Sequence, residues 1–155
     1  MIIWDELPPN FEAICEVFPG ASAPGVVFAF APDIYAPGLN GHTLSPHIKA
    51  HEEVHVLRQG NNPTMWWHRY LTEDVFRLHE ETLAHLAEAR SILDAIGWNR
   101  KNRKRVSAIV GDRIAAPLYK YDSDVTGKKC EKLIYHLLTK DTDECCGQGC
   151  DEVFK

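Results

Sequence analysis

Apolar and polar residues follow two different patterns along the chain, and the change between them falls near residue 45. Residues 26–31 form a β-branched and aromatic run between Gly25 and Pro32, which predicts a buried strand. Residues 11–18 have partial period-two character, and residues 42–44 fit a short edge strand. We therefore expect two to four strands before residue 45.

The segment after residue 45 carries start and stop signals of helices. Ser45 can cap a helix that has Pro46 at its first position, and Gly60 ends it. Asn62 and Pro63 then start a short helix. This helix carries three large aromatic side chains: Trp66, Trp67 and Tyr70.

Three longer helical segments follow. Apolar positions recur near helical spacing over residues 72–96, and Gly97 closes this segment. Further helices are expected at about residues 101–118 and 126–138. Because no repeat or long linker divides the chain, we predict one α+β domain over residues 1–138, with a small N-terminal sheet and then a helical body. Residues 139–155 form a cysteine-rich tail.

The first helix contains an H-E-x-x-H motif made by His51, Glu52 and His55. Residues four apart lie on one helix face, so the two imidazoles can take two corners of a zinc tetrahedron. Glu52 is rotated by about 100° around the helix, which puts it beside the metal, where it can take a proton from metal-bound water. The alternative is that both histidines are surface residues of an amphipathic helix.

A catalytic zinc usually needs a third protein ligand and keeps one position open. His47 is on the same helix, where three histidines of one face rarely occupy three tetrahedral corners. Glu80 and Glu81 on the long helix are the other candidates, and Glu81 is favoured because the small Ala84 follows three residues later. Two roles stay open for Arg77: a simple ion pair with Glu81 on an exposed face, or orientation of a ligating carboxylate.

The composition adds limits on partners and location. The chain has 155 residues with a net charge of −5, which argues against nucleic acid as the main partner. The basic run at residues 100–105 is interpreted as a solvated helix start, with contact to nucleic acid or an acidic partner as the alternative. No apolar run approaches the roughly 18 residues of a membrane span, and the N-terminus lacks a secretory signal pattern, so we expect a cytoplasmic protein without membrane contact.

Five cysteines, three of them in the last eleven residues, suit a reducing compartment better than a disulfide framework. Four of them could hold a second zinc, or less readily an iron–sulfur cluster: Cys130, Cys145, Cys146 and Cys150. Free thiols are the alternative, because the spacing contains no C-x-x-C pair of the kind found in zinc ribbons.

The order of these motifs resembles small gluzincin-type zinc metallopeptidases, most of all H-E-x-x-H proteins encoded by bacteriophages and prophages. The matching pieces are residues 51–55, W-W-x-R-Y-L at residues 66–71, F-R-x-x-x-E-x-x-A at residues 76–84, and the segments 115–119 and 130–138. The resemblance implies a zincin-like fold. It also implies a peptide or protein substrate, a phage or host protein partner, and a place in the host cytoplasm or in the virion.

For the site, the resemblance implies His51, His55 and Glu81 as zinc ligands and Glu52 as the general base. His85 stands where many relatives have tyrosine, so its role as a ligand-orienting or transition-state residue is open. Tyr70 is a second candidate to stabilise an oxyanion.

The sequence thus predicts a zinc peptidase in which an edge strand at residues 42–44 aligns an extended peptide. The rival hypothesis is a non-catalytic phage structural or accessory protein that keeps a structural metal. A closed fourth position, filled by His47, His85 or a cysteine, would favour this rival.

Overall fold

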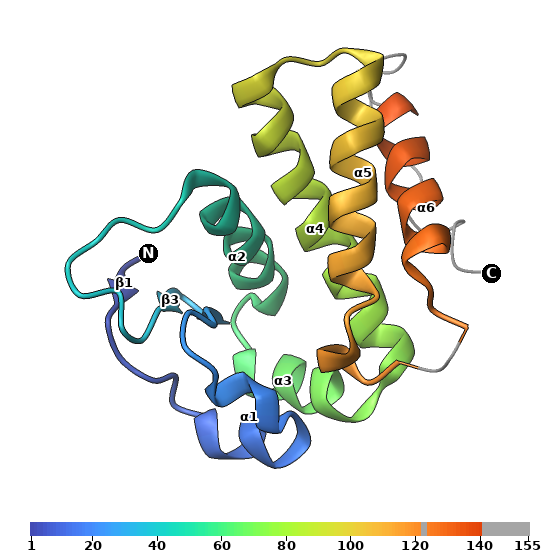
Figure 1. The fold of residues 1–155 in the computed structure, drawn as a ribbon. Coiled ribbons are helices and arrows are strands. Elements are labelled where there is room, and N and C mark those ends of the chain that lie inside the picture. Colours follow the sequence, from blue (N-terminus) through green and yellow to red (C-terminus); the bar gives the residue numbers. More distant parts are fainter. Residues whose placement is uncertain (122–123, 141–155) are drawn as a thin grey trace.

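The computed structural model describes residues 1–121 and 124–140, and these residues have an α+β fold (Figure 1). A three-stranded sheet near the N-terminus has the order β1-β3-β2. Its strands are β1 (Ile3–Trp4), β2 (Phe28–Phe30) and β3 (Asp33–Tyr35). β1 runs parallel to β3 and β2 antiparallel to it, with Phe28 opposite Tyr35. The predicted fold class, a small N-terminal sheet followed by a helical body, is confirmed.

The rest of the described chain is mainly helical. The helices and 3-10 turns are α1 (Phe11–Val17), η1 (Pro19–Ser22), α2 (Pro46–Gln59), α3 (Pro63–Thr72), α4 (Asp74–Ile96), α5 (Arg100–Ile114), η2 (Pro117–Tyr119) and α6 (Gly127–Lys140). Helix α2 packs against β2 on one side and against α4 on the other, while α5 lies between α4 and α6 (Figure 1). None of the helices in the described ranges is long and apolar enough to cross a membrane.

Two strand predictions are wrong. Residues 11–17 fold as helix α1, which buries Ile14, and Phe18, four positions after Ile14 and directly after the helix, is buried as well. Residues 42–44 form a loop and no strand. The turn before this loop is held by Asp5, whose carboxylate accepts hydrogen bonds from the backbone N–H groups of residues 38–40.

Helix α5 also ends earlier than expected, at Ile114 instead of about residue 118. Pro117 has no N–H and disfavours a helical residue before it, and Ala116 is indeed extended, with ψ at 140°. The chain therefore turns into the 3-10 segment η2, which ends at Tyr119. This turn carries Tyr119 back toward α4.

Two hydrophobic clusters support these elements. One lies between α4, α5 and α6 and includes Leu93, Val110 and Ile134, each with no exposed surface. Helices α5 and α6 approach so closely that a Cβ on Gly111 would lie 2.5 Å from the backbone nitrogen of Glu131. The other cluster joins α1, β2 and α3 through aromatic side chains.

Candidate metal centre

Helices α2 and α4 bring His51, His55 and Glu81 together. The two Nε2 atoms of the histidines lie 3.2 Å apart. His55 Nε2 is 3.2 Å from Glu81 Oε1, and His51 Nε2 is 3.6 Å from Glu81 Oε2. In a tetrahedral zinc site with bonds of about 2.0–2.1 Å, the ligand atoms lie about 3.3–3.4 Å from one another. These distances run to different oxygens of Glu81, but one ligand atom from each of the three side chains lies within 4.8 Å of the other two, so the three residues could hold a metal ion.

The neighbouring Glu80 faces elsewhere. Its carboxylate accepts hydrogen bonds from Arg58 at 2.6 and 2.7 Å and from Trp66 Nε1 at 3.2 Å. It is fully buried in this ion pair. Of the two consecutive glutamates, Glu81 is thus the one that meets the motif histidines, as the presence of the small, fully buried Ala84 one turn later predicts.

The protonation states suit a cation. Burial lowers the pKa of His51, so its imidazole is neutral and has a lone pair to give. Burial alone would raise the pKa of Glu81, but the adjacent His55 and His51 bring it below its usual range, so the carboxylate is charged. Buried Glu81 Oε2 has no hydrogen-bond partner among residues 1–121 and 124–140. A cation between these three side chains would give this oxygen a partner.

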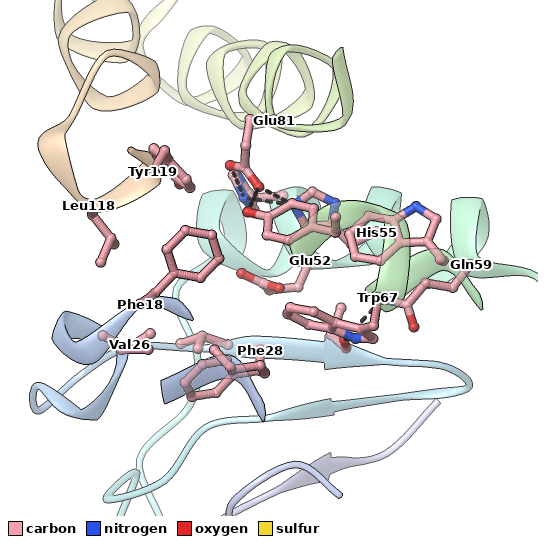
Figure 2. A pocket seen from close by; sticks show the side chains of 17 residues that line it. Phe18, Val26, Phe28, Glu52, His55, Gln59, Trp67, Glu81, Leu118 and Tyr119 are labelled. Atoms are coloured by element: carbon pink, nitrogen blue, oxygen red, sulfur yellow. Dashed lines mark hydrogen bonds and ion pairs between the residues drawn. The ribbon is translucent and has the colours of Figure 1, made fainter. Parts of the chain in front are cut away.

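Glu52, on α2, lies next to the three candidate ligands, and it is only 7% exposed. Figure 2 shows its carboxyl below His55 and Glu81, turned toward a cavity. Burial raises its pKa to about 8. In the metal-free protein the carboxyl is therefore protonated at neutral pH, while a nearby cation would favour the charged form.

Behind the centre lies Glu88, a residue that the sequence analysis missed. Its Oε2 accepts a 2.7 Å hydrogen bond from His85 Nδ1 and lies 3.8 Å from His51 Nδ1. Arg113 of α5 binds the other oxygen of Glu88. By spacing alone, His51, His85 and Glu88 could also hold a cation, but the guanidinium already neutralises this carboxylate. Glu88 is better suited to orient the imidazoles, a role it shares with many carboxylates around metal sites.

Arg77 is 2% exposed and organises two tyrosines. Its guanidinium donates to the backbone oxygens of Tyr70 at 2.6 Å and Tyr119 at 3.0 Å, and it also binds Asp74. A surface ion pair between Arg77 and Glu81 is therefore wrong as a prediction, since both side chains are buried. Arg77 acts on Glu81 through Tyr70, whose hydroxyl donates a 2.5 Å hydrogen bond to Glu81 Oε1.

Tyr119 was predicted only as part of a segment that resembles the family, without a role. Its hydroxyl lies 3.5 Å from His85 Nε2. Burial raises the pKa of Tyr119 well above its usual value, so the group stays a hydrogen-bond donor. Tyr119 borders the cavity that Glu52 faces. The position of Tyr119 at the cavity could not be predicted from the sequence, because it depends on helix α5 ending at Ile114, before Pro117.

The cavity beside the centre has a volume of about 590 Å³, including the part that opens to solvent. Its walls are mainly apolar and aromatic. Figure 2 shows six of these side chains: Phe18, Val26, Phe28, Trp67, Leu118 and Tyr119. They come from the end of α1, the loop before β2, β2, α3 and η2. The three candidate ligands and Glu52 also line the cavity, and Figure 2 shows the carboxylate of Glu81 above that of Glu52.

The grouping of His51, His55 and Glu81 extends to no fourth His, Cys, Asp or Glu within the described ranges. Cys130 belongs to the hydrophobic cluster between α4, α5 and α6, and not to the group of candidate metal ligands. Burial raises the pKa of its thiol. The other cysteines of the predicted second zinc site, Cys145, Cys146 and Cys150, lie outside the described residues. That site stays a prediction.

Comparisons of the chain with protein-family models, with curated proteins and with solved structures gave no match. The resemblance to gluzincin-type peptidases therefore stays a prediction as well. Function has to be argued from the geometry of this centre and its cavity.

Proposed function

We propose that the protein is a zinc-dependent peptidase. One observation carries the proposal: three buried side chains that could hold one metal ion, His51, His55 and Glu81, line a cavity together with a fourth buried side chain, Glu52. Three protein ligands with room for water are typical of catalytic zinc, whereas structural zinc sites are closed by four.

The donor set favours zinc among the common cations. Two imidazole nitrogens and one carboxylate are a usual ligand set for catalytic zinc, while magnesium and calcium prefer oxygen ligands throughout. A bound zinc would lower the pKa of its water and polarise the carbonyl of a substrate.

Glu52 is the proposed proton carrier. Its carboxylate would accept the proton that the attacking water loses as the new C–O bond forms. When the C–N bond breaks, the same carboxyl would return this proton to the leaving amine, so that Glu52 ends as it began. The pKa of about 8 in the metal-free site means that the carboxyl holds a proton easily.

Tyr119 is the proposed donor to the oxyanion that forms at the carbonyl. Its hydroxyl borders the cavity, where it interacts with Glu81 and lies 3.5 Å from His85 Nε2, so it is placed beside the candidate metal centre. Tyr70 is less suited to this task because its hydroxyl is committed to Glu81 at 2.5 Å. His85, which burial keeps neutral by lowering its pKa to about 3, would support Tyr119.

The rival hypothesis is a non-catalytic phage structural or accessory protein with a structural metal. It requires a fourth protein ligand, which the described residues do not add to the group of three. The phage origin, a host protein partner, and a place in the host cytoplasm or the virion stay predictions that rest on the resemblance.

The test combines metal content with activity. We expect one zinc per chain by plasma mass spectrometry, lost in Glu81→Ala and kept in Cys150→Ser. Glu52→Gln should keep the zinc and lose peptide hydrolysis at least about 100-fold. Glu53→Gln is the matched control, since this glutamate is on the same helix but exposed, in a pair with Lys49. Full activity in Glu52→Gln, or zinc retained in Glu81→Ala, would contradict the proposal.

A further inference from the structure

We infer that the cavity beside the metal centre selects a large apolar side chain next to the scissile bond, and that this bond lies within a chain and not at its end. This inference rests on the proposed peptidase function and specifies its substrate class. It is carried by the lining of the cavity, by its charges, and by the state of the neighbouring sheet edge.

The apolar walls are preformed. Phe18 and Phe28 are each 5% exposed, and each packs edge-on against another ring: Phe18 on Tyr70 at 6.3 Å and Phe28 on Phe11 at 5.8 Å. Trp67 is fixed by a 3.0 Å hydrogen bond from its indole to the Ala29 oxygen. A side chain that enters this space therefore meets fixed rings and needs little rearrangement. The space opens in part to solvent and is lined mainly by apolar side chains, as sites for apolar groups usually are.

The charges in the lining exclude recognition of chain ends. Among the described residues, the lining contains no lysine or arginine, so the α-carboxylate of a C-terminal residue would find no cationic side chain there. The acidic groups in the lining are Glu52 and Glu81, and both have tasks at the metal centre. A free α-ammonium group would have to compete for them.

The sheet edge next to the cavity is partly closed. β2 is an edge strand, because the order is β1-β3-β2. Gln59 caps its outer side: its amide donates to the Ala29 oxygen at 2.9 Å, and its own oxygen accepts from the Ala31 N–H at 2.7 Å. These backbone groups would otherwise pair with a substrate strand. Because Gln59 limits hydrogen bonding between β2 and the main chain of a substrate, the apolar cavity is the main source of selectivity among substrate side chains.

The first test measures binding, without any need for turnover. Two N-acetylated amino-acid hydroxamates, one derived from leucine and one from aspartate, are titrated calorimetrically into the zinc-loaded protein. We expect the leucine compound to bind about 10- to 100-fold more tightly, the ratio that burial of one such side chain gives. Equal affinities would overturn the inference and leave the peptidase proposal standing. If neither compound binds to zinc-loaded protein, the accessible metal site itself is refuted, and the proposed function falls with the inference.

A cavity-filling variant locates the effect. Val26 lines the cavity and is partly exposed, so Val26→Phe adds volume there with little risk to the fold. It should weaken the leucine compound at least about 10-fold and leave the aspartate compound and the zinc content unchanged. Val75→Phe is the matched control at a position that is 74% exposed. An unchanged ratio of the two affinities in Val26→Phe would place the selectivity elsewhere and overturn the inference.

The second part of the inference, cleavage within a chain, has its own test. A peptide with one central leucine is prepared with free ends and with acetylated and amidated ends. Both forms should be cut next to the leucine at the same rate within about twofold. A loss of cleavage on blocking either end would show that the site binds chain termini.

Discussion

The hydroxyl of Tyr70 donates a 2.5 Å hydrogen bond to Glu81 Oε1, the same oxygen that lies 3.2 Å from His55 Nε2. Tyr70 thereby fixes the rotation of the carboxylate that faces both histidines. The tyrosine is fixed in turn by Arg77, which binds its backbone oxygen at 2.6 Å. A chain of contacts thus runs from the start of α4 to the candidate ligand one turn later.

Tyr70→Phe should weaken zinc binding. The change keeps the ring and removes only the hydroxyl that orients Glu81. We expect a loss of about 10- to 100-fold in affinity, measured by competition with a chelator. Tyr121→Phe is the control, because the buried hydroxyl of Tyr121 has no hydrogen-bond partner within the described ranges. Equal affinities in the two variants would mean that Tyr70 does not orient the carboxylate.

Glu88→Gln should also weaken zinc binding, from the opposite side of the centre. The neutral amide loses the charge that holds His85 at 2.7 Å and faces His51. We again expect a loss of about 10- to 100-fold in zinc affinity. Glu53→Gln removes the same charge from an exposed position on α2 and should leave the affinity unchanged. Tighter binding in Glu88→Gln would contradict the orienting role.

Tyr119→Phe should separate catalysis from metal binding. If its hydroxyl stabilises the oxyanion, kcat falls by about 100-fold or more in a variant that still contains zinc. The measurement is kcat on a leucine-containing peptide together with the zinc content of the same preparation. A variant with unchanged kcat would contradict this role of Tyr119.

The metal-free protein should lose stability as the pH rises. The pKa of Glu52 is about 8 in the folded state, against 4.5 for the ordinary carboxyl. Between these values the unfolded chain has released this proton and the native state still binds it, so the free energy of unfolding falls with increasing pH. The slope approaches about 1.4 kcal/mol per pH unit and vanishes above the native pKa.

Urea unfolding of the metal-free wild type and of Glu52→Gln checks this prediction. The amide does not titrate, so the stability difference between the two proteins should shift by a few kcal/mol in favour of the variant across this pH range. A difference that stays constant with pH would show that Glu52 is charged in the native metal-free protein.

The sequence predicts the fold class and the helix pair of the site because both depend on strong local signals. Ser45, Pro46 and Gly60 delimit α2 where the structure has it, and four-residue spacing alone puts His51 and His55 on one face. The weaker signals fail. The strand predicted for residues 11–18 from partial period-two character is wrong, because these residues fold mainly as helix α1, with Ile14 buried within it and Phe18 buried directly after it.

The rest of the site depends on contacts between distant segments. Glu88 lies two turns beyond Glu81 on the same helix face, so spacing could have suggested it, but its partner Arg113 comes from α5. Tyr119 reaches the cavity only because α5 stops before Pro117. No local pattern contains that information, since it depends on how α4, α5 and η2 pack together.

The two consecutive glutamates of α4 limit how this gene segment can change. Glu80 belongs to an ion pair with Arg58, and Glu81 belongs to the metal centre. Inserting or deleting one residue before them would rotate the helix by about 100° relative to Arg77 and its tyrosines. The stretch from Arg77 to Glu88 should therefore tolerate substitutions on its outer face but no change of length. The surface loop between β3 and α2, which contributes no ligand, is the natural place for insertions.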